Sequence, residues 1–362
     1  MKVLAISSYA RLGGAELTLR TFATHLPQGV ELAAVAIGSG DLPSVLTEAG
    51  IPTWRAPGLD GRPSPAAVMG YSRGLARILR QFRPNVVWAI GLKAAILSLP
   101  SARLMRTPVA WHKVDFSLDH VIARPLARAV DGIVAVSNPA ASALGERLRE
   151  RKLLAVIPPP VALGDELTSQ PDPAQPVIGT LGTLMPIKGH AHLLQATATL
   201  SREFPHLRVA IGGGQTPVFP HHRAELLQLA RELGIEDRVE LLGRTDPAAL
   251  LQRLTVYVSA TYRDRNYGYE GLSGAMLEAS WTGVPVVATW GGGTPDGVID
   301  GQTGTLVPPA DPPALATAIG AYLRDPELAR RTGEAGRRFA RARFAPGPST
   351  EALFSALGRI TR

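Results

Sequence analysis

Short β-branched runs alternate with longer amphipathic stretches along the first half of the chain. The short runs predict strands at residues 2–7, 31–37, 85–90, 108–111 and 132–137. The stretches between them have helical periodicity and predict helices near residues 14–26, 41–49, 65–82, 119–129 and 138–150. This alternation is typical of a parallel sheet with helices on its faces.

A proline-rich passage, IPPPVALGDELTSQPDPAQP at residues 157–176, interrupts the alternation because it favours neither helix nor strand. Beyond it, strands are predicted near residues 176–181, 207–212, 239–243, 256–260, 285–289 and 303–308, with helices that include 189–203 and 222–233. The tail from about residue 312 is helical, with a break at 344–349. The pattern predicts two Rossmann-like α/β domains, residues 1–160 and 161–345, followed by a final helix at 346–362.

Composition narrows the class of protein. The 362 residues are 45% hydrophobic and 19% charged, as in ordinary globular proteins. Cysteine is absent, which excludes disulfides, thiolate catalysis and zinc–thiolate sites. No apolar run reaches the roughly 18 residues of a spanning helix, and the start, MKVLAISSYA, reads as a strand rather than a signal peptide. We therefore expect a cytoplasmic protein.

The formal net charge of +8 comes entirely from the first half. Residues 1–160 contain 19 Lys and Arg against 10 Asp and Glu, whereas residues 161–362 contain 19 against 20. Arg73, Arg77 and Arg80 fall at helical spacing and so share one helix face. This face is either an ordinary solvated surface or a contact for an anionic membrane or an acidic acceptor. Because no nucleic-acid recognition motif accompanies it, we expect no nucleic-acid partner.

Ligands of open α/β sheets bind beyond the carboxyl ends of the strands, so the strand-to-helix turns are informative. In SSYARLGGAEL (7–17), Gly13 and Gly14 open a helix whose free N–H groups suit an anion; the spacing is not GxGxxG, which disfavours a dinucleotide site. In GTLMPIKGH (182–190), Lys188 is the single lysine after residue 160 and suits a phosphate. The alternatives are a plain tight turn and a surface lysine, respectively.

The stretch YEGLSGAMLEASWTGVPVV (269–287) carries Glu270 and Glu278 within an otherwise apolar helix-and-strand pattern. Eight helical residues separate their backbones by roughly 12 Å. This spacing exceeds the roughly 5 to 9.5 Å of glycosidase carboxylate pairs. It suits two carboxylates that accept hydrogen bonds from hydroxyls at the two ends of one extended ligand. The alternative for Glu278 is a structural partner such as an arginine.

Taken together, these motifs resemble the retaining glycosyltransferases of the GT-B fold, family 4 type, over nearly the whole chain. The features that carry the resemblance are the GGAE turn at Gly13, His112, Ser137, Lys188–Gly189, Gly243, the E-x7-E pair, the following GVPVVA and the Gly291–Gly293 turn. The resemblance implies two Rossmann-like domains that face each other across a cleft. The nucleotide-sugar would bind mainly to the C-terminal domain and the acceptor to the N-terminal one, with the last helix crossing back.

Carried over residue by residue, the resemblance implies that Lys188 binds the diphosphate, that Glu278 accepts hydrogen bonds from the ribose hydroxyls and that Glu270 accepts them from the donor sugar. Gly13 and Gly14 would approach the diphosphate, and His112 would lie near the transferred sugar, although a histidine beside Trp111 is also an ordinary packed residue. The resemblance adds further donor-binding positions: Thr183, Gly243, Arg244, Gly271, Leu272 and Ser273.

Three positions depart from the family pattern. Thr183 stands where the family usually has an arginine, so a phosphate cation is either absent or supplied by Arg244 or Arg263. Pro158–Pro160 replaces a Pro-Asn-Gly, and Asp296 takes the place of a glutamate after the Gly-Gly turn. We expect no metal and no cofactor, because Asp264 has no partner in a D-x-D pair.

The resemblance implies transfer from a UDP-sugar or GDP-sugar to a hydroxyl of a glycolipid, a polysaccharide or a small glycoside. No second carboxylate is positioned as a nucleophile, which favours the front-face retaining route, with the charge of the leaving diphosphate neutralised by its cradle. Three alternatives stay open: a non-catalytic nucleotide-sugar-binding relative, a GT-B sugar phosphorylase and, less well matched, an NAD dehydrogenase. The basic half predicts peripheral association with a membrane as a further possibility.

Overall fold

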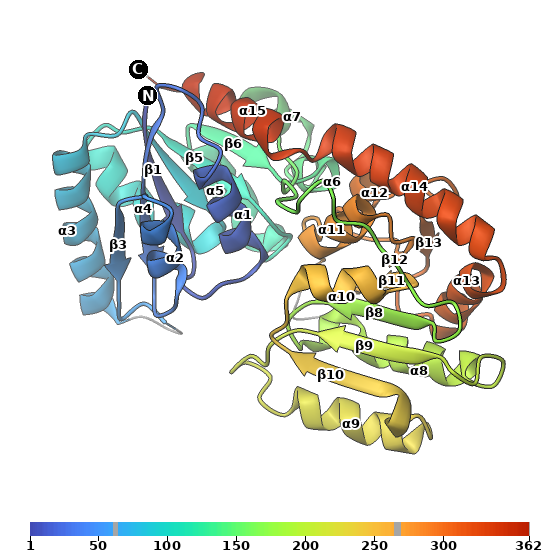
Figure 1. Ribbon diagram of the computed structural model, residues 1–362. Helices are drawn as coiled ribbons and strands as arrows, with labels where there is room; N and C mark the ends of the chain where they lie inside the picture. The colour runs from blue at the N-terminus through green and yellow to red at the C-terminus, as the bar shows by residue number, and fades with distance from the viewer. Residues whose placement is uncertain (61–63, 264–268, 362) are drawn as a thin grey trace. The chain divides into compact units, whose positions relative to one another are not determined.

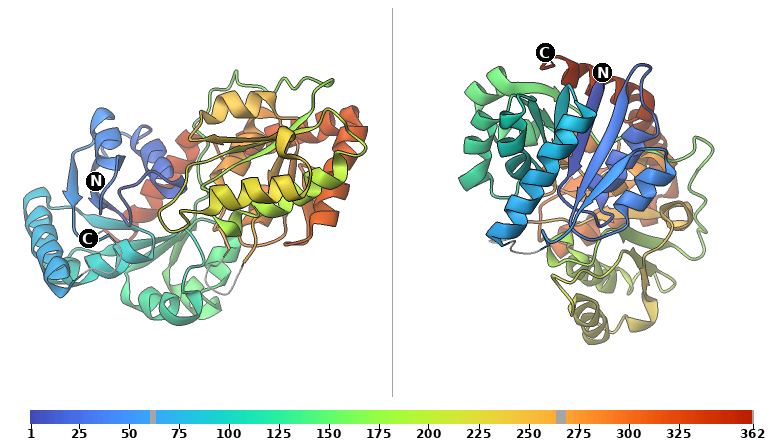
Figure 2. Two further views of the ribbon diagram at one scale, coloured as in Figure 1. Left: turned by 90° about the horizontal axis from the view of Figure 1, so that it is seen from below. Right: turned by 90° about the vertical axis from the view of Figure 1, so that its left-hand side faces the viewer.

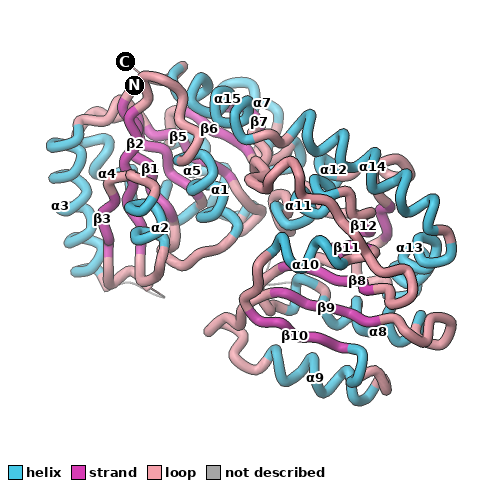
Figure 3. The backbone as a smooth tube through the Cα atoms, viewed as in Figure 1, coloured by secondary structure: helices cyan, strands magenta, loops and turns pink. Residues whose placement is uncertain are grey.

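The computed structural model describes residues 1–60, 64–263 and 269–361 (Figure 1). The chain divides into two compact units, one of Met1–Pro160 with Ala345–Arg362 and one of Val161–Phe344. Each unit alternates strands and helices along the chain, as the tube in Figure 3 makes visible. The predicted fold class, two parallel-sheet Rossmann-like α/β domains, is confirmed.

Over its described residues, the first unit has a seven-stranded sheet in the order β3-β2-β1-β4-β5-β6-β7, and each neighbouring pair is parallel. The strands are β1 (Lys2–Ser7), β2 (Glu31–Ile37), β3 (Thr53–Ala56), β4 (Val86–Ile90), β5 (Val109–Lys113), β6 (Gly132–Ala135) and β7 (Leu153–Val156). Most of their residues are buried on both faces, which explains the continuous apolar runs in the sequence.

Helices cover both faces of this sheet. They are α1 (Gly14–Ala23), α2 (Leu42–Glu48), α3 (Pro65–Phe82), α4 (Leu92–Leu104), a π-helical turn (Asp119–Ala123), α5 (Arg124–Ala129), α6 (Asn138–Ser142), α7 (Glu146–Lys152) and the C-terminal α15 (Pro346–Gly358). The helices α3, α4 and α5 share one buried cluster with the sheet, and α1, α2 and α15 share the other. In Figure 2, the light-blue α3 and the dark-red α15 accordingly lie on opposite sides of the blue strands.

The second unit has a six-stranded parallel sheet over its described residues, in the order β10-β9-β8-β11-β12-β13. The strands are β8 (Val177–Leu181), β9 (Arg208–Gly212), β10 (Val239–Gly243), β11 (Val256–Ser259), β12 (Val286–Thr289) and β13 (Thr305–Val307). The helices are α8 (His190–Leu200), α9 (His222–Glu232), α10 (Pro247–Arg253), α11 (Gly274–Thr282), α12 (Thr294–Gly297), α13 (Pro312–Arg324) and α14 (Pro326–Arg343).

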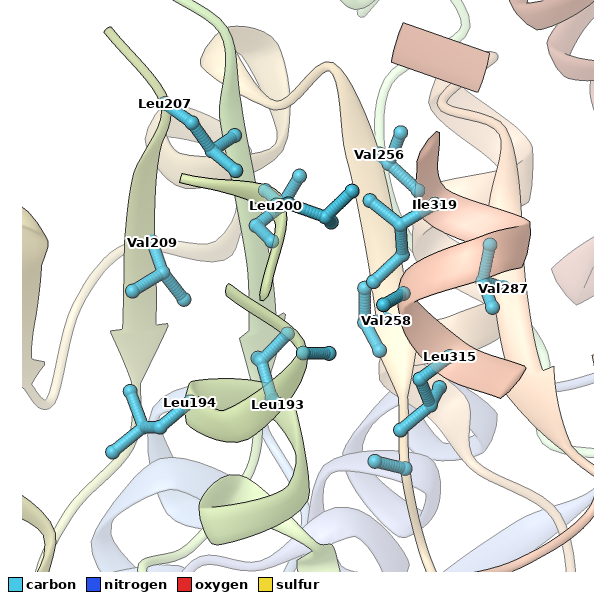
Figure 4. Close-up of a cluster of buried hydrophobic side chains, with 14 of the residues drawn as sticks. Leu193, Leu194, Leu200, Leu207, Val209, Val256, Val258, Val287, Leu315 and Ile319 are labelled. Atoms are coloured by element: carbon cyan, nitrogen blue, oxygen red, sulfur yellow. The ribbon is translucent and has the colours of Figure 1, made fainter. Parts of the chain in front are cut away.

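One face of the second sheet packs against α8, α9 and α13 through a continuous apolar cluster. Figure 4 shows Leu315 and Ile319 of α13 lying against Val256 and Val258 of β11, and Leu193 of α8 belongs to the same cluster. The other face carries α10 and α11, and α14 packs against α11. Within the described residues, no helix combines the length and apolar character needed to cross a membrane.

The predicted elements differ from the observed ones in a few places. The short strands β3 and β7 and the helix α4 are absent from the prediction. Helix α4 is apolar on most sides and contains Pro100, so it lacks the amphipathic period that reveals a helix. In the tail, α14 ends at Arg343 and α15 begins at Pro346, so the predicted break is two residues long rather than six.

Candidate functional site

The second sheet has a topological switch point between β8 and β11. From β8 the chain adds β9 and β10 on one side, and it then adds β11, β12 and β13 on the other. In open parallel sheets, ligands bind beyond the carboxyl ends of the strands at such a point. A ligand site is therefore expected at the turns after β8 and β11, which carry Lys188 and Glu270.

Lys188 ends a short 3₁₀ turn, Pro186–Lys188, that follows β8. The next residue, Gly189, has a φ of 68°, and a Cβ there would lie 2.0 Å from the carbonyl oxygen of Ala260, just after β11. Only glycine permits both this backbone conformation and this approach. The turn after β8 is thus closed tightly against the turn after β11.

Across these two turns, the Lys188 ammonium donates to Oε1 of Glu270. The other carboxylate oxygen of Glu270, Oε2, accepts from the Thr261 hydroxyl at 3.0 Å. The side chains of Lys188 and Glu270 are 20% and 27% exposed, so solvent still reaches the pair. The result is a cation and a carboxylate held together where the fold places ligands.

Glu270 does not lie on a helix, contrary to the prediction. Helix α11 begins at Gly274 with Ser273 as its N-cap, so Glu270 belongs to the preceding turn. The helical spacing of roughly 12 Å between the two glutamates therefore does not apply. Instead, the Glu270 backbone lies against the turn after β12, where Gly293 N–H donates to the Glu270 carbonyl at 3.2 Å and a Cβ on Gly292 would lie 2.2 Å from it.

Glu278 lies on α11 and is partly buried, and desolvation raises its pKa to about 7. Among the described residues, its carboxylate has no hydrogen-bond or ion-pair partner, so the alternative of a structural arginine partner is not met there. Glu278 and Glu270 both contribute to raising the pKa of the buried Tyr257 hydroxyl on β11, after burial itself. The two carboxylates therefore approach the same part of the sheet edge.

The turns after β8, β9 and β10 bring further predicted donor residues together. Thr183 is exposed, and the next residue, Leu184, donates its N–H to the Gly214 carbonyl at 3.0 Å. The Arg244 side chain packs directly over Gly214. Gly243 accepts from Gly213 N–H at 2.7 Å. Arg244, after β10, and Thr183, after β8, therefore lie on either side of the turn that follows β9.

The remaining predicted donor positions surround Glu270. Gly271 and Leu272 are buried, and Ser273 caps the N-terminus of α11. The Arg263 guanidinium lies 6.0 Å from the centre of the Tyr269 ring, beside Glu270. Asp296 is partly buried in α12. Asp264, considered above as a metal ligand, lies outside the described residues.

In the first unit, Gly13 and Gly14 open α1 after β1. A buried carboxylate lies beside this turn: Glu16 is 5% exposed and accepts a hydrogen bond from the Ser7 hydroxyl at 2.9 Å. Burial raises the pKa of Glu16, and hydrogen bonds from Ser7 and from the backbone at Glu16 and Gly13 oppose that shift. A Cβ on Gly13 would lie 3.1 Å from the Glu16 carboxylate, whereas Gly14 faces open space.

His112 lies within β5, paired with Ile90 and Val134, rather than after a strand as predicted. Its ring is stacked on Trp88, and Nδ1 accepts from Trp88 Nε1–H at 3.3 Å, which leaves the proton on Nε2. Burial lowers the pKa of His112 to about 4, so the ring is neutral at physiological pH. Among the described residues, the buried Nε2 has no hydrogen-bond partner.

Three contributors to these sites were not among the predicted residues: Thr261, Tyr257 and Glu16. Glu16 had a usable signal, because a glutamate three residues after an N-cap reaches back to the cap. Thr261 and Tyr257 had none, since their importance depends on which strand is adjacent. Within the described residues, no group of three or more His, Asp and Glu could hold a metal ion. The roles predicted for individual site residues stay predictions.

Comparison with known families gives two adjoining matches. The family model described as "Glycosyltransferase Family 4" matches residues 12–164. The model described as "Glycosyl transferases group 1" matches residues 168–339. The boundary between the two matches falls in the segment that joins β7 to β8.

Individual proteins match over almost the whole chain. A GDP-mannose-dependent alpha-(1-6)-phosphatidylinositol monomannoside mannosyltransferase of Mycolicibacterium smegmatis is 29% identical over 357 residues, 91% of each chain. The lipopolysaccharide core biosynthesis mannosyltransferase LpcC of Rhizobium leguminosarum bv. viciae is 26% identical, over 99% of this chain and 96% of that one. The structure of Anabaena Alr3699/HepE in complex with UDP and glucose superposes with a TM-score of 0.84 at 21% identity, covering 99% of this chain and 100% of that one.

Proposed function

Because this chain belongs to the GT-B glycosyltransferases of the family 4 type, we propose that it transfers a sugar, with retention, from a nucleoside diphosphate sugar to an acceptor hydroxyl. The observation that carries this proposal is the Lys188–Glu270 pair at the switch point of the second sheet. A phosphate-binding cation and a hydroxyl-binding carboxylate there match the two chemical parts of such a donor.

The diphosphate binds to Lys188 and to the N-terminus of α11. Backbone N–H groups at a helix start carry a partial positive charge and donate to phosphate oxygens. Ser273 is the N-cap of this helix, and Gly271 and Leu272 lead into it directly after Glu270. The base stays open between uracil and guanine: the M. smegmatis relative is named GDP-mannose-dependent, and the Anabaena protein binds UDP.

Donor binding exchanges the partners of Lys188. The diphosphate is the stronger anion, so the ammonium turns from Glu270 toward it. Glu270, still held by the Thr261 hydroxyl, then accepts hydrogen bonds from the hydroxyls of the donor sugar. The same rearrangement thus makes Lys188 available to the diphosphate and Glu270 available to the sugar.

Glu278 accepts from the two ribose hydroxyls. A carboxylate whose pKa is about 7 and which has no partner among the described residues is poorly stabilised in its charged form. Two hydroxyl donors would supply the missing hydrogen bonds and favour ionisation. The nucleoside therefore gains affinity from a group that the protein by itself leaves under-satisfied.

Arg244 supplies the second phosphate cation in place of the arginine that Thr183 replaces. The Arg244 side chain packs over Gly214, whose carbonyl accepts from Leu184 N–H next to Thr183. A guanidinium that extends across the turn after β9 can reach the same phosphate and bind it in a bidentate manner. In the first unit, His112 serves as a neutral hydrogen-bond donor through Nε2 rather than as a base.

The acceptor is a hydroxyl compound handled by the first unit, near an anionic membrane surface that the basic face of α3 contacts. Arg73, Arg77 and Arg80 are exposed on this face, whereas Tyr71, Leu75 and Leu79 are buried beneath it. The mannosyltransferase relative is named for a phosphatidylinositol monomannoside, a lipid acceptor. The acceptor chemistry and the charge are therefore compatible.

Thr183 favours a second candidate, a nucleotide-sugar-binding relative that performs no transfer. A screen of nucleotide sugars by thermal shift, followed by mass analysis of the reaction with the best donor, separates the two. We expect stabilisation by one donor and a product heavier than the acceptor by one sugar. Stabilisation without transfer or donor hydrolysis supports the second candidate, and the absence of nucleotide-dependent stabilisation contradicts both. A sugar phosphorylase would instead require added phosphate or a coenzyme absorbance.

The matched control for this screen is Lys188→Gln. It removes the cation but keeps a side chain of similar length, so the fold of the turn is retained. We expect it to lose about 1.5 to 3 kcal/mol of affinity for the nucleoside diphosphate, as for a charge-assisted hydrogen bond. If the diphosphate binds Lys188→Gln as well as it binds the wild type, the donor site lies elsewhere.

A further inference from the structure

A hollow of about 430 Å³ opens at the edge of the first sheet where β4 and β5 begin. This volume falls within the range of small-molecule sites. All strands of the sheet are parallel, so this edge is opposite the one at which Gly13 and Gly14 follow β1. The hollow is therefore separate from the donor-site residues described above, and it shares Arg80 with the basic face of α3.

Three arginines line the hollow: Arg80 and Arg83 at the end of α3, and Arg106 after α4. The sequence has a similar pattern at these two places, RQFRPN at 80–85 and RLMRTP at 103–108, each with R-x-x-R and a proline one or two residues later. Strands β4 and β5 are neighbours, and α3 packs against α4, so the two repeats lie side by side. The two segments thus place arginines side by side at the end of the sheet where β4 and β5 begin.

The second arginine of each repeat has a left-handed backbone. Arg83 has a φ of 51° and Arg106 a φ of 54°. Glycine or asparagine commonly ends a helix in this conformation, and another residue there is strained. The helix dipoles do not explain the choice, because Arg80 and Arg103 already place a cation in the last turn of α3 and α4. Leu118 and Ala310 also have a positive φ, so the conformation alone does not require a ligand, but Arg83 and Arg106 are the pair that meets at one hollow.

The charge of the three lining arginines is not neutralised by neighbours. Among the described residues, Arg80, Arg83 and Arg106 make no ion pair and no side-chain hydrogen bond, and no acid lines the hollow. The acidic residues along this edge are engaged elsewhere, Glu31 with Lys2 at 3.0 Å and Asp131 with Val109 N–H at 2.9 Å. The hollow is consequently a site of positive potential.

We propose that this hollow binds a phosphate group, presented either by a free phosphorylated metabolite or by a lipid headgroup. Guanidinium groups match the geometry of phosphate oxygens and bind them in a bidentate manner. Asn85 and Thr107, which also line the hollow, add neutral donors; Asn85 Oδ1 already accepts from Lys2 N–H at 2.7 Å, which orients its amide N–H groups. The inference is independent of the donor site proposed on the second unit.

The left-handed arginines make the test favourable, because Arg83→Gly with Arg106→Gly removes both side chains while relieving backbone strain. The double variant should therefore unfold at the same temperature as the wild type or higher. Titration calorimetry with inorganic phosphate and with glycerol 3-phosphate should show at least about a hundredfold weaker binding, tenfold for each charge-assisted hydrogen bond that is removed. The double variant Arg73→Gln with Arg77→Gln removes the same charge from exposed positions of α3 outside the hollow and should retain the affinity.

Lys188→Gln separates this site from the proposed donor site: it should leave phosphate binding at the hollow unchanged. Equal phosphate affinity in the wild type and the glycine pair, or an equal loss in the control pair, would overturn the proposal. The two sources are distinguished with phosphatidylcholine vesicles that carry phosphatidic acid or, at matched surface charge, phosphatidylglycerol. A lipid source gives a preference for phosphatidic acid over phosphatidylglycerol, and this preference is lost in the glycine pair. A free metabolite gives glycerol 3-phosphate binding with no preference between the vesicles.

Discussion

Lys188 and Glu270 are 82 positions apart in the sequence, yet their side chains form an ion pair beyond the carboxyl ends of β8 and β11. Both side chains remain partly exposed, so the pair is open to exchange with a ligand. Partly exposed pairs contribute little to folding stability, on the order of 1 kcal/mol or less. Under the proposed function, an incoming diphosphate would compete for the ammonium, and a sugar hydroxyl for the carboxylate.

Replacing Glu270 by alanine should abolish sugar transfer while nucleoside diphosphate affinity stays the same or rises. The reason is that Lys188 loses an anion that competes with the diphosphate. The hydroxyls of the donor sugar, in contrast, lose the carboxylate that accepts their hydrogen bonds. Transfer is measured by mass analysis of the product, and affinity by calorimetry with the nucleoside diphosphate.

The control for this prediction is Thr261→Val, which removes the hydroxyl that donates to Glu270 Oε2 but keeps the carboxylate. It should reduce kcat without abolishing transfer. The activation free energy of transfer should rise by about 0.5 to 1.5 kcal/mol, as for the loss of one hydrogen bond. A parallel loss of diphosphate affinity and transfer in Glu270→Ala would mean that Glu270 does not bind the sugar.

The replacement of the usual arginine by Thr183 leads to a rescue experiment. Arg244→Gln should weaken nucleoside diphosphate binding by about 1.5 to 3 kcal/mol, because one charge-assisted hydrogen bond is removed. Adding Thr183→Arg to this variant should restore most of the affinity, since the new guanidinium occupies the position at which the family usually has an arginine. Arg263→Gln is the matched single-charge control. A loss for Arg263→Gln but not for Arg244→Gln would assign the second cation to Arg263 instead.

The raised pKa of Glu278 predicts a conflict between stability and binding. The carboxyl has its ordinary pKa of 4.5 in the unfolded chain and about 7 in the folded one. Between these values the folded state holds more protons, so the free energy of unfolding falls as pH rises through this window and levels off above about 7. The cost is at most on the order of 3 kcal/mol, because the side chain keeps some contact with water.

Glu278→Gln removes this titration and should therefore be more stable than the wild type above pH 7 and no more stable near pH 4.5. The same variant should bind the nucleoside diphosphate more weakly by about 1.5 to 3 kcal/mol, because a neutral amide replaces the ribose-binding carboxylate. Thermal unfolding across pH tests the first statement, and calorimetry the second. Unchanged nucleotide affinity in the folded variant would refute the ribose role.

Periodicity was sufficient to predict both sheets, because their strands are buried on both faces and their helices are mostly amphipathic. It failed for α4, whose apolar residues surround the helix, and for β3 and β7, the two edge strands of the first sheet, none of whose residues is fully buried. It also extended α11 back to Glu270, although the glycines and the Ser273 cap place the helix start at Gly274. These errors arise where tertiary packing, rather than local pattern, decides the structure.

The candidate site was accessible to prediction only in part. Lys188, Glu270 and Glu278 could be singled out because charged residues in apolar strand-to-helix turns are uncommon, and such turns meet at one sheet edge. The Lys188–Glu270 pair and the contribution of Thr261 could not, because they require β8 and β11 to be neighbours, which the sequence does not state. His112 was misplaced for the same reason: the length of β5 depends on its pairing with β4 and β6.

The basic face of α3 predicts electrostatic binding to anionic membranes. Each arginine near such a surface contributes about 1 kcal/mol, screened beyond a Debye length of roughly 8 Å at physiological salt. Co-sedimentation with vesicles should therefore depend on anionic lipid and decrease steeply as salt is added. Replacing Arg73, Arg77 and Arg80 by glutamine should weaken it without changing nucleoside diphosphate affinity, since all three are exposed and belong to the first unit.

The matched control removes three exposed arginines from α14 of the second unit, Arg330, Arg331 and Arg338, and thus changes net charge equally. Arg330 and Arg331 pair with Glu327 and Glu334 of the same helix, and this control leaves every arginine of α3 in place. Vesicle binding should survive in this control. If both triple variants lose binding to the same degree, net charge rather than the α3 face governs it. If the wild type does not bind anionic vesicles even at low salt, the charge of the first unit serves a soluble acceptor instead.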